Sequence, residues 1–461
     1  MTRPTASSTP TKDPGATGRD TSGVRRRRTP AVAAVALLAA VALLPACGNS
    51  SSGKSAGGTS TTATTTGSAK PSTQPGVTDT EIRVGGVASV TNPLGGKYDT
   101  AFEGVKAYFD KVNSEGGVDG RQLKLVSERD DKVASNKDEV RGLLEQDNVF
   151  AVLPVATLLF TGADQLVAAG VPAFGWTINP EWQGTPENPK ANLFGQAGSY
   201  LCLGCEQPAV PYIAKQAGRK KVGLLGYAVP QSSQCVEGYD KSFAKYGKEA
   251  GAEVVFKDSS LSYGTTDFSV QVAKMKDAGV DMVVTCIDTN GVVGLAKELK
   301  KQDVKAIQYL PNAYDQELLD EYGDLFEGSY LYTSFLPLES KNPSQGMKDY
   351  RTWIAKAGGN VGENSLVGWL NAAQFVEGLR KAGPDFTRQK VIDAINAETD
   401  WTADGLLSGV NWTESHTKRS NISCSATLKV VGSKFQPVEG PGGTPFVCFD
   451  VSSGTLGTVR Q

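Results

Sequence analysis

Residues 48–55 have the spacing Gly-x-x-x-x-Gly-Lys-Ser, which matches the phosphate-binding loop of nucleotide hydrolases. In such a loop, backbone N–H groups surround a phosphate, the lysine reaches the outer phosphates and the hydroxyl holds magnesium. This geometry requires a buried strand before the loop and a helix after it. Here Leu44, Pro45 and Ala46 end a short apolar run before the loop, and a stretch rich in Ser, Thr and Gly follows. We therefore interpret the match as chance.

Acid–base and nucleophilic chemistry have little support in the sequence. The chain has one histidine, His416, in the polar stretch TESHTKRS, which we expect to be a solvated loop. No G-x-S-x-G motif follows a predicted strand, and the sequence has no cluster of histidines for a catalytic metal. The neighbouring acids Asp130 and Asp131 are interpreted as a solvated strand end rather than an acid–base pair. We predict no catalytic residue, no metal and no cofactor.

Seven cysteines make an odd number, so in an exported protein one of them needs a separate explanation. Without Cys47, six remain, enough for three disulfides in an oxidising compartment. Cys424 and Cys448 flank strand-like segments and are predicted to pair. Cys202-x-x-Cys205 is predicted to be a local disulfide rather than a redox pair or half of a zinc site, although the pairing of these two with Cys235 and Cys286 stays open.

The N-terminus indicates export. A polar, arginine-containing stretch is followed by the uncharged apolar residues 31–44, a run too short for a membrane span and typical of a signal peptide. Residues 44–47, LPAC, resemble the lipobox of bacterial lipoproteins. This resemblance implies that Cys47 is lipidated and becomes the mature N-terminus, anchoring the protein to the outer face of the cell membrane. The alternatives left open are an ordinary signal peptide with a free cysteine, and the Sec or twin-arginine route.

Residues 47–76 are predicted to be a disordered tether, because Ser, Thr and Gly cannot bury enough surface to offset the ordering entropy. Such a tether spans about 30 Å. Seven of the 47 basic and two of the 49 acidic side chains precede Cys47, so the mature chain has a net charge of −7. This charge argues against a nucleic-acid partner.

From residue 81 the chain alternates strand-like and helix-like segments, which predicts an α/β fold. The first series has strands at 81–88, 122–131, 149–155 and 171–176 and helices at 100–117 and 135–147, the latter opened by a capping pair of Ser135 and Asp138. A second series begins at 221, with a helix predicted at 237–251. Residues 343–398 are mostly helical, and their apolar stripe is expected to pack on the first sheet. Two doubly wound parallel-sheet lobes are therefore expected.

The order and spacing of several stretches resemble the type I periplasmic binding proteins of the leucine/isoleucine/valine family. These stretches are GVTDTEIRVGG to SERDD, LLEQDNVFAVLPVAT, GVPAFGWTINPEW, EGYDKSFAKYGKEAGAEVV and NAAQFVEGLRKAG, and the likeness covers 77 to about 403. The resemblance implies two lobes joined by a three-crossing hinge, with the ligand between them. Lobe 1 is expected at 77–199 with 336–405, and lobe 2 at 200–335 with 406–461.

In open parallel sheets, ligands bind beyond the carboxyl ends of the strands. By resemblance, Thr157 and Thr177 are hypothesised to hold a carboxylate or similar polar head, with Tyr98 or Trp176 against the apolar part. Each threonine could equally be a helix cap. In lobe 2, Asp288 is the first candidate for meeting an ammonium group, with Asp315 behind it. Cys235 occupies the position at which amino-acid-binding relatives have an aromatic residue, so an amino acid, an amide or urea, and an aromatic acid all stay possible. Tyr227 and Asn312 complete the predicted set.

The resemblance implies a non-enzymatic, monomeric solute-binding lipoprotein of an ABC importer, which captures a small polar solute by hinge closure and delivers it to a permease and its ATPase subunits. The alternative is a ligand-sensing lipoprotein of the same fold that reports to a receptor.

Overall fold

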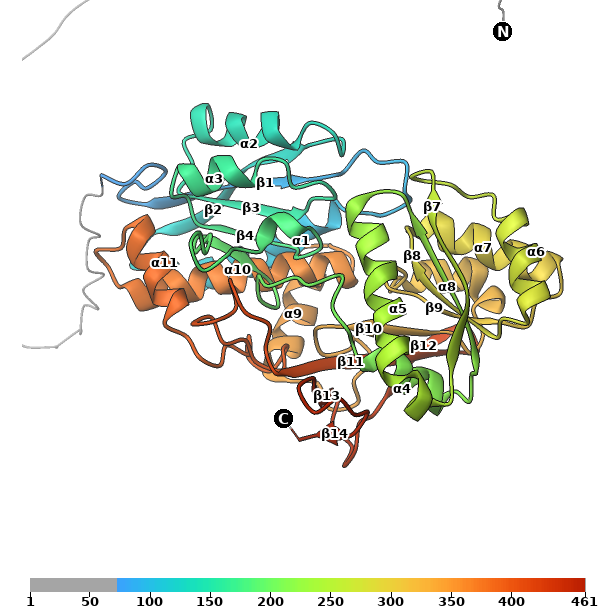
Figure 1. Cartoon of the computed structure of the whole chain (residues 1–461). Coiled ribbons are helices and arrows are strands. Elements are labelled where there is room, and N and C mark those ends of the chain that lie inside the picture. The colour runs from blue at the N-terminus through green and yellow to red at the C-terminus, as the bar shows by residue number, and fades with distance from the viewer. Residues whose placement is uncertain (1–72, 461) are drawn as a thin grey trace, which may run out of the picture. The chain divides into compact units, whose positions relative to one another are not determined.

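The computed structural model describes residues 73–460, which form two α/β lobes (Figure 1). Lobe 1 contains a five-stranded sheet of order β2-β1-β3-β4-β5 in which all neighbouring strands are parallel. Both faces of this sheet are covered, and β3 is buried along its whole length, as expected for such a sheet. The strands are β1 (Glu81–Ala88), β2 (Gln122–Asp130), β3 (Ala151–Ala156), β4 (Ala173–Gly175) and β5 (Leu193–Gly195). The predicted signal peptide, Cys47 and nearly all of the tether lie outside the described residues.

Helices cover both faces of the lobe 1 sheet, and the predicted apolar stripe of α10 is buried. Two glycines allow α1 and α10 to approach closely. A Cβ at Gly104 would lie 1.8 Å from the carbonyl oxygen of Ser365, and one at Gly368 would lie 1.9 Å from that of Ala101. The helices are α1 (Thr100–Ser114), α2 (Asn136–Glu145), α3 (Ala163–Ala168), α9 (Gln345–Lys356), α10 (Glu363–Ala382) and α11 (Arg388–Asn396), and a 3-10 turn lies at Pro180–Trp182.

Lobe 2 contains a sheet of order β14-β13-β11-β10-β9-β8-β6-β7, with β12 also paired to β11. The strands from β7 to β10 are parallel, as predicted, whereas β11–β14 add an antiparallel part from the C-terminal segment. The strands are β6 (Lys221–Tyr227), β7 (Glu253–Leu261), β8 (Met282–Cys286), β9 (Ile307–Tyr309), β10 (Tyr330–Thr333), β11 (Ile422–Val431), β12 (Lys434–Val438), β13 (Val447–Asp450) and β14 (Thr458–Val459).

The lobe 2 helices lie on both faces of the parallel strands. The helix after β6 begins at Pro230 rather than at the predicted Glu237, because a proline fits the first helical position. It ends as expected at Gly251, which has a φ of 69°. The helices are α4 (Ala209–Gln216), α5 (Pro230–Ala250), α6 (Ser269–Ala278), α7 (Thr289–Lys301) and α8 (Gln316–Tyr322), followed by a 3-10 turn at Gly323–Leu325.

The chain passes between the lobes three times, between β5 and α4, between β10 and α9, and between α11 and β11. The crossing segments are hydrogen-bonded to one another. The amide of Leu336 donates to the carbonyl of Leu406 at 2.7 Å, and the amide of Ser199 donates to Oγ of Ser415 at 3.1 Å. The expected three-crossing connection is therefore present. Within residues 73–460, no helix has the length and apolar character that crossing a membrane requires.

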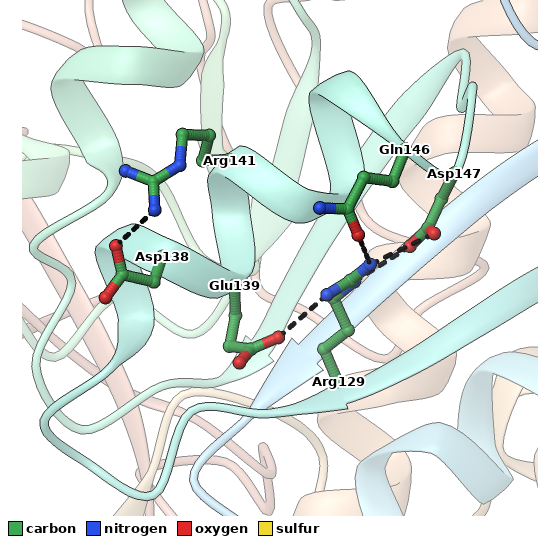
Figure 2. A network of polar contacts seen from close by, with 6 residues as sticks. All are labelled: Arg129, Asp138, Glu139, Arg141, Gln146 and Asp147. Atoms are coloured by element: carbon green, nitrogen blue, oxygen red, sulfur yellow. Dashed lines mark hydrogen bonds and ion pairs between the residues drawn. The ribbon is translucent and has the colours of Figure 1, made fainter.

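Three local expectations are wrong. Ser135 precedes α2 but makes no side-chain capping bond, and Asp138 instead accepts a 2.7 Å bond from Arg141 (Figure 2). His416 is only 6% exposed rather than solvated, because the loop folds back over lobe 1 and its Nε2 lies 2.7 Å from Oδ1 of Asn396. Asp131 is fully buried, although its neighbour Asp130 lies at the end of β2.

Candidate functional site

A network of buried polar side chains fixes the start of the loop between β1 and α1 (residues 89–99). Ser89 Oγ donates to Oδ1 of Asp131 at 2.7 Å and accepts a 3.1 Å bond from the amide of Leu158, at the end of β3. Asp131 also accepts bonds from the amide of Val133 and from Nδ2 of Asn136. Burial raises the pKa of Asp131. The acid that we expected at a solvated strand end therefore positions two loops at the carboxyl edge of the lobe 1 sheet.

The same loop contacts lobe 2. Asn290, near the start of α7, donates its Nδ2 to the carbonyl of Pro93 at 2.9 Å, and its amide donates to the carbonyl of Leu94 at 3.2 Å. Lys97 forms an ion pair with Glu317 in α8. The β1–α1 loop therefore joins the lobes through contacts that are separate from the three chain crossings.

Tyr98 and Trp176, predicted to contact the apolar part of a solute, lie near each other. Their ring centroids are 6.0 Å apart with an interplanar angle of 47°, and Tyr98 is only 7% exposed. Burial raises the pKa of Tyr98, and the charges of Asp288 in lobe 2 and Glu363 in lobe 1 contribute in the same direction. Tyr98 therefore lies where groups from both lobes come together.

Thr157 and Thr177 both lie at the carboxyl edge of the lobe 1 sheet, and their hydroxyls have internal acceptors. Thr157 Oγ1 donates to the carbonyl of Val87 at 3.5 Å, and Thr177 Oγ1 donates to that of Gly198 at 2.9 Å. The amide of Thr177 donates to Oε1 of Gln196 at 2.8 Å. Because these donors are engaged within lobe 1, a bound carboxylate would have to compete with existing bonds, and the role assigned to the two threonines stays a prediction.

The lobe 2 candidates Tyr227, Asp288 and Asn312 lie around the N-terminus of α7. Asp288 caps this helix by accepting a 2.9 Å bond from the amide of Gly291, and its second oxygen accepts a hydrogen bond from the hydroxyl of Tyr227. Burial is the main cause of the raised pKa of Tyr227, and the hydrogen bond to Asp288 adds to it. Asn312 Nδ2 donates to the carbonyl of Ile287 at 3.1 Å, which fixes the loop before Asp288.

Sequence reasoning missed three further residues that interact electrostatically with Tyr98 or with one another. Tyr263 and Tyr332 are each 38% exposed and Glu363 is partly buried, yet burial raises the pKa of Tyr263 to about 12, that of Tyr332 above its ordinary value and that of Glu363 to about 8. We name Tyr98, Tyr263, Tyr332 and Glu363 the interlobe group, because Tyr98 and Glu363 belong to lobe 1 and the other two to lobe 2. Tyr263 and Glu363 both raise the pKa of Tyr98, and Glu363 raises that of Tyr332.

These residues lacked a sequence signal because no motif links them. Tyr263 lies in the loop after β7, Tyr332 on β10 and Glu363 at the start of α10. Tyr263 packs edge-on against Tyr227 with centroids 5.6 Å apart, and Tyr332 stacks on Tyr309 at 5.9 Å. The concentration of tyrosine in lobe 2 segments was the available clue.

The six cysteines of the described part form three disulfides. The predicted pairs Cys424–Cys448 and Cys202–Cys205 are confirmed, and the pairing that was left open is Cys235–Cys286. The last bond joins α5 to the end of β8, two residues before Asp288. Residues 73–460 contain no group of His, Cys, Asp or Glu side chains arranged to hold a metal ion.

Two α/β lobes with polar and aromatic side chains gathered where they meet define a two-lobed binding protein. A model of the periplasmic binding protein family matches residues 81–434, and the chain belongs to this family.

Relatives agree with this assignment. The Leu/Ile/Val-binding protein homolog 7 of Brucella suis is 26% identical over 343 residues, which are 70% of this chain and 84% of that protein. A fatty acid ABC transporter substrate-binding protein from Thermomonospora curvata has a TM-score of 0.64 at 20% identity, covering 85% of this chain and 95% of that one. A branched-chain amino acid ABC transporter protein from Thermus thermophilus with bound valine has a TM-score of 0.64 at 20% identity, covering 79% and 97%. At these identities the structural likeness shows the fold.

Proposed function

We propose that this chain is the extracytoplasmic solute-binding protein of an ABC importer and that it captures a small polar solute between its lobes by hinge closure. The observation that carries the proposal is the contact of the β1–α1 loop with lobe 2 through Asn290 and Glu317. These bonds can break when the lobes separate, whereas the covalent crossings persist. A solute that contacts both lobes would stabilise the arrangement in which these bonds are formed.

The hinge consists of the three hydrogen-bonded crossings. We propose lobe boundaries near residues 199, 335 and 405, within the segments that connect the two sheets. The proposed solutes are branched-chain amino acids and carboxylates, which the names of the relatives suggest, together with amides or urea. Capture needs no chemical step, which agrees with a family of binding proteins.

The anchoring part of the proposal concerns residues outside the described range. Cys47 would carry the lipid, and residues 47–76 would tether a monomeric binding protein to the membrane near its permease. Replacing Cys47→Ala should release the protein into the medium. Its retention at the membrane would contradict the lipid anchor without touching the solute-binding proposal.

Thermal-shift measurements test solute binding, because a ligand that binds the native state raises the melting temperature by mass action. The exported chain, purified in mild detergent, is screened against amino acids, amides, urea, aromatic acids and fatty acids. A solute that raises the melting temperature should also reduce the radius of gyration in small-angle X-ray scattering. If no class of solute has either effect, the proposal is wrong. Uptake of the identified solute by cells with and without the protein then separates an importer from a sensor.

A further inference from the structure

We propose that Glu363, in the first turn of α10, binds a cationic group of the solute, so that the solutes of this protein are small molecules bearing an ammonium, amidinium or quaternary ammonium group. This inference rests on the proposed function, because it requires a solute held between the lobes. It names a recognition residue in lobe 1, whereas the sequence pointed to Asp288 in lobe 2.

The start of α10 is held rigidly beside the β1–α1 loop. The amide of Gly362 donates to the hydroxyl of Tyr350 at 3.0 Å and to Oγ of Ser365 at 3.2 Å. Asn364 Nδ2 donates to the carbonyl of Lys97 at 3.3 Å. Glu363 lies between these fixed residues, so its backbone is positioned before any solute binds, and a preorganised group costs less entropy on binding.

The carboxylate of Glu363 has no hydrogen bond and no ion pair among residues 73–460, unlike the other acids near it. Asp288 has one oxygen on the amide of Gly291 and the other on the hydroxyl of Tyr227. Lys97, in the adjoining loop, pairs with Glu317. Burial raises the pKa of Glu363 to about 8, and the charge of Asp315 adds to this. A partly buried acid without a counter-ion is stabilised in its charged form by a cation.

The surroundings of Glu363 suit a cation for a second reason. Its charge raises the pKa of three tyrosines, Tyr98 from lobe 1 and Tyr314 and Tyr332 from lobe 2, so these phenols lie within its electrostatic reach. Tyr332 exposes 38% of its surface. Tyrosine ring faces attract cations, and aromatic rings are used to recognise quaternary ammonium ligands. No cation is among the causes of the Glu363 shift, so a carboxylate-only solute would find no opposite charge at this residue.

The first test compares probes that differ in the cationic group. L-leucine, choline and 1,5-diaminopentane carry it, whereas 4-methylpentanoate, benzoate and octanoate do not. We expect binding, measured by calorimetry on the exported chain in mild detergent, only within the first set. Glu363→Gln should weaken the affinity for the probe that binds by about 10- to 100-fold, the usual effect of losing a hydrogen bond to a charged group.

Glu187→Gln is the matched control. It removes the same charge from an exposed side chain that has no side-chain hydrogen bond or ion pair within the described residues, and it should leave the affinity unchanged. The melting temperature of Glu363→Gln without solute shows whether the variant is folded.

The second test needs no variant. Because a cation binds the ionised carboxylate, the affinity of the unchanged protein for choline or another cationic probe should rise between pH 6 and pH 8 and level off above. The increase can reach about 100-fold for a group with a pKa two units above the lower pH. The titratable and charged groups facing Glu363 are Tyr98, Tyr314, Tyr332, Asp315 and the Lys97–Glu317 pair; the tyrosines have raised pKa values and keep their protons in this range.

The outcomes separate the inference from the proposed function. If probes without a cation bind as well, or if affinity falls above pH 8, Glu363 acts as a protonated donor and the inference is wrong while solute capture stands. If a cationic probe binds and neither Glu363→Gln nor pH changes its affinity, the inference is also wrong. If no probe of either set binds and the wider screen is negative, the proposed function fails and the inference fails with it.

Discussion

The side-chain amide of Asn290, in lobe 2, donates a 2.9 Å hydrogen bond to the carbonyl of Pro93, in lobe 1. The backbone amide of Asn290 donates to the next carbonyl, that of Leu94. One residue at the start of α7 therefore makes two bonds to the β1–α1 loop. A Cβ at Gly95 would lie 2.5 Å from Oδ1 of Asn290, so this glycine permits the close approach.

Replacing Asn290→Ala should shift the lobes toward a separated arrangement. Loss of one hydrogen bond of about 1 kcal/mol lowers the solute affinity by about fivefold. The radius of gyration without solute, measured by small-angle X-ray scattering, should increase. Asn188→Ala is the control, because Asn188 is exposed and its side chain makes no hydrogen bond within residues 73–460. An unchanged affinity and radius for Asn290→Ala would show that this contact has no part in closure.

The disulfide Cys235–Cys286 should contribute more stability than Cys202–Cys205. The first closes a separation of 51 residues and the second a separation of 3. The chain-entropy model gives about 4 kcal/mol for the long loop and about 2 kcal/mol for the short one. Urea unfolding of the two double variants, Cys235→Ala with Cys286→Ala and Cys202→Ala with Cys205→Ala, compares them directly. Equal losses would contradict the entropic explanation.

His416 should make the protein sensitive to acid. Burial lowers its pKa to about 4, below the ordinary value of about 6.5. Between these two values His416 is protonated in the unfolded chain and neutral in the folded chain. The free energy of unfolding therefore falls as pH decreases from 6.5 toward 4. Between pH 7 and pH 4.5 the loss is about 2 kcal/mol.

Because His416 is the only histidine in the chain, His416→Gln isolates this effect. Urea unfolding at pH 7 and pH 4.5 should show a smaller decrease in the variant, even if the variant is less stable at both values. The same decrease in both proteins would mean that His416 is protonated when folded.

Arg129 joins β2 to both ends of α2 (Figure 2). It donates two bonds to the carboxylate of Asp147, at 2.8 and 3.0 Å, and one to Glu139 at 2.9 Å. Arg129→Gln should reduce the free energy of unfolding by about 2 kcal/mol, because these charge-assisted bonds are partly shielded from water.

Arg141→Gln is the matched control for this network. Arg141 has a single pair with Asp138, and their side chains are 51% and 66% exposed. Exposed ion pairs contribute about 0 to 1 kcal/mol to the free energy of unfolding, so this variant should be nearly as stable as the unchanged protein. Similar losses in the two variants would indicate that the shielding of Arg129 is unimportant.

Much of the fold could be predicted because its signals are local. The alternation of apolar strands with amphipathic helices predicted both parallel sheets, and α1 and α2 lie close to where the pattern put them. The start of α5 was missed because its first two turns are mostly polar and contain a partly buried cysteine that is held by a disulfide. His416 and Asp131 were misjudged because their sequence neighbours are polar, whereas their burial comes from segments far away in the chain.

The sequence by itself determined the two α/β series, the number of cysteines available for disulfides and the charge of the mature chain, since each depends on composition or on short-range periodicity. Only the tertiary structure decided that Cys235 pairs with Cys286 and that Tyr98, Tyr263, Tyr332 and Glu363 come within electrostatic reach of one another. These residues come from four separate segments of the two lobes, and no local pattern encodes which loops meet when parallel strands end at the same edge.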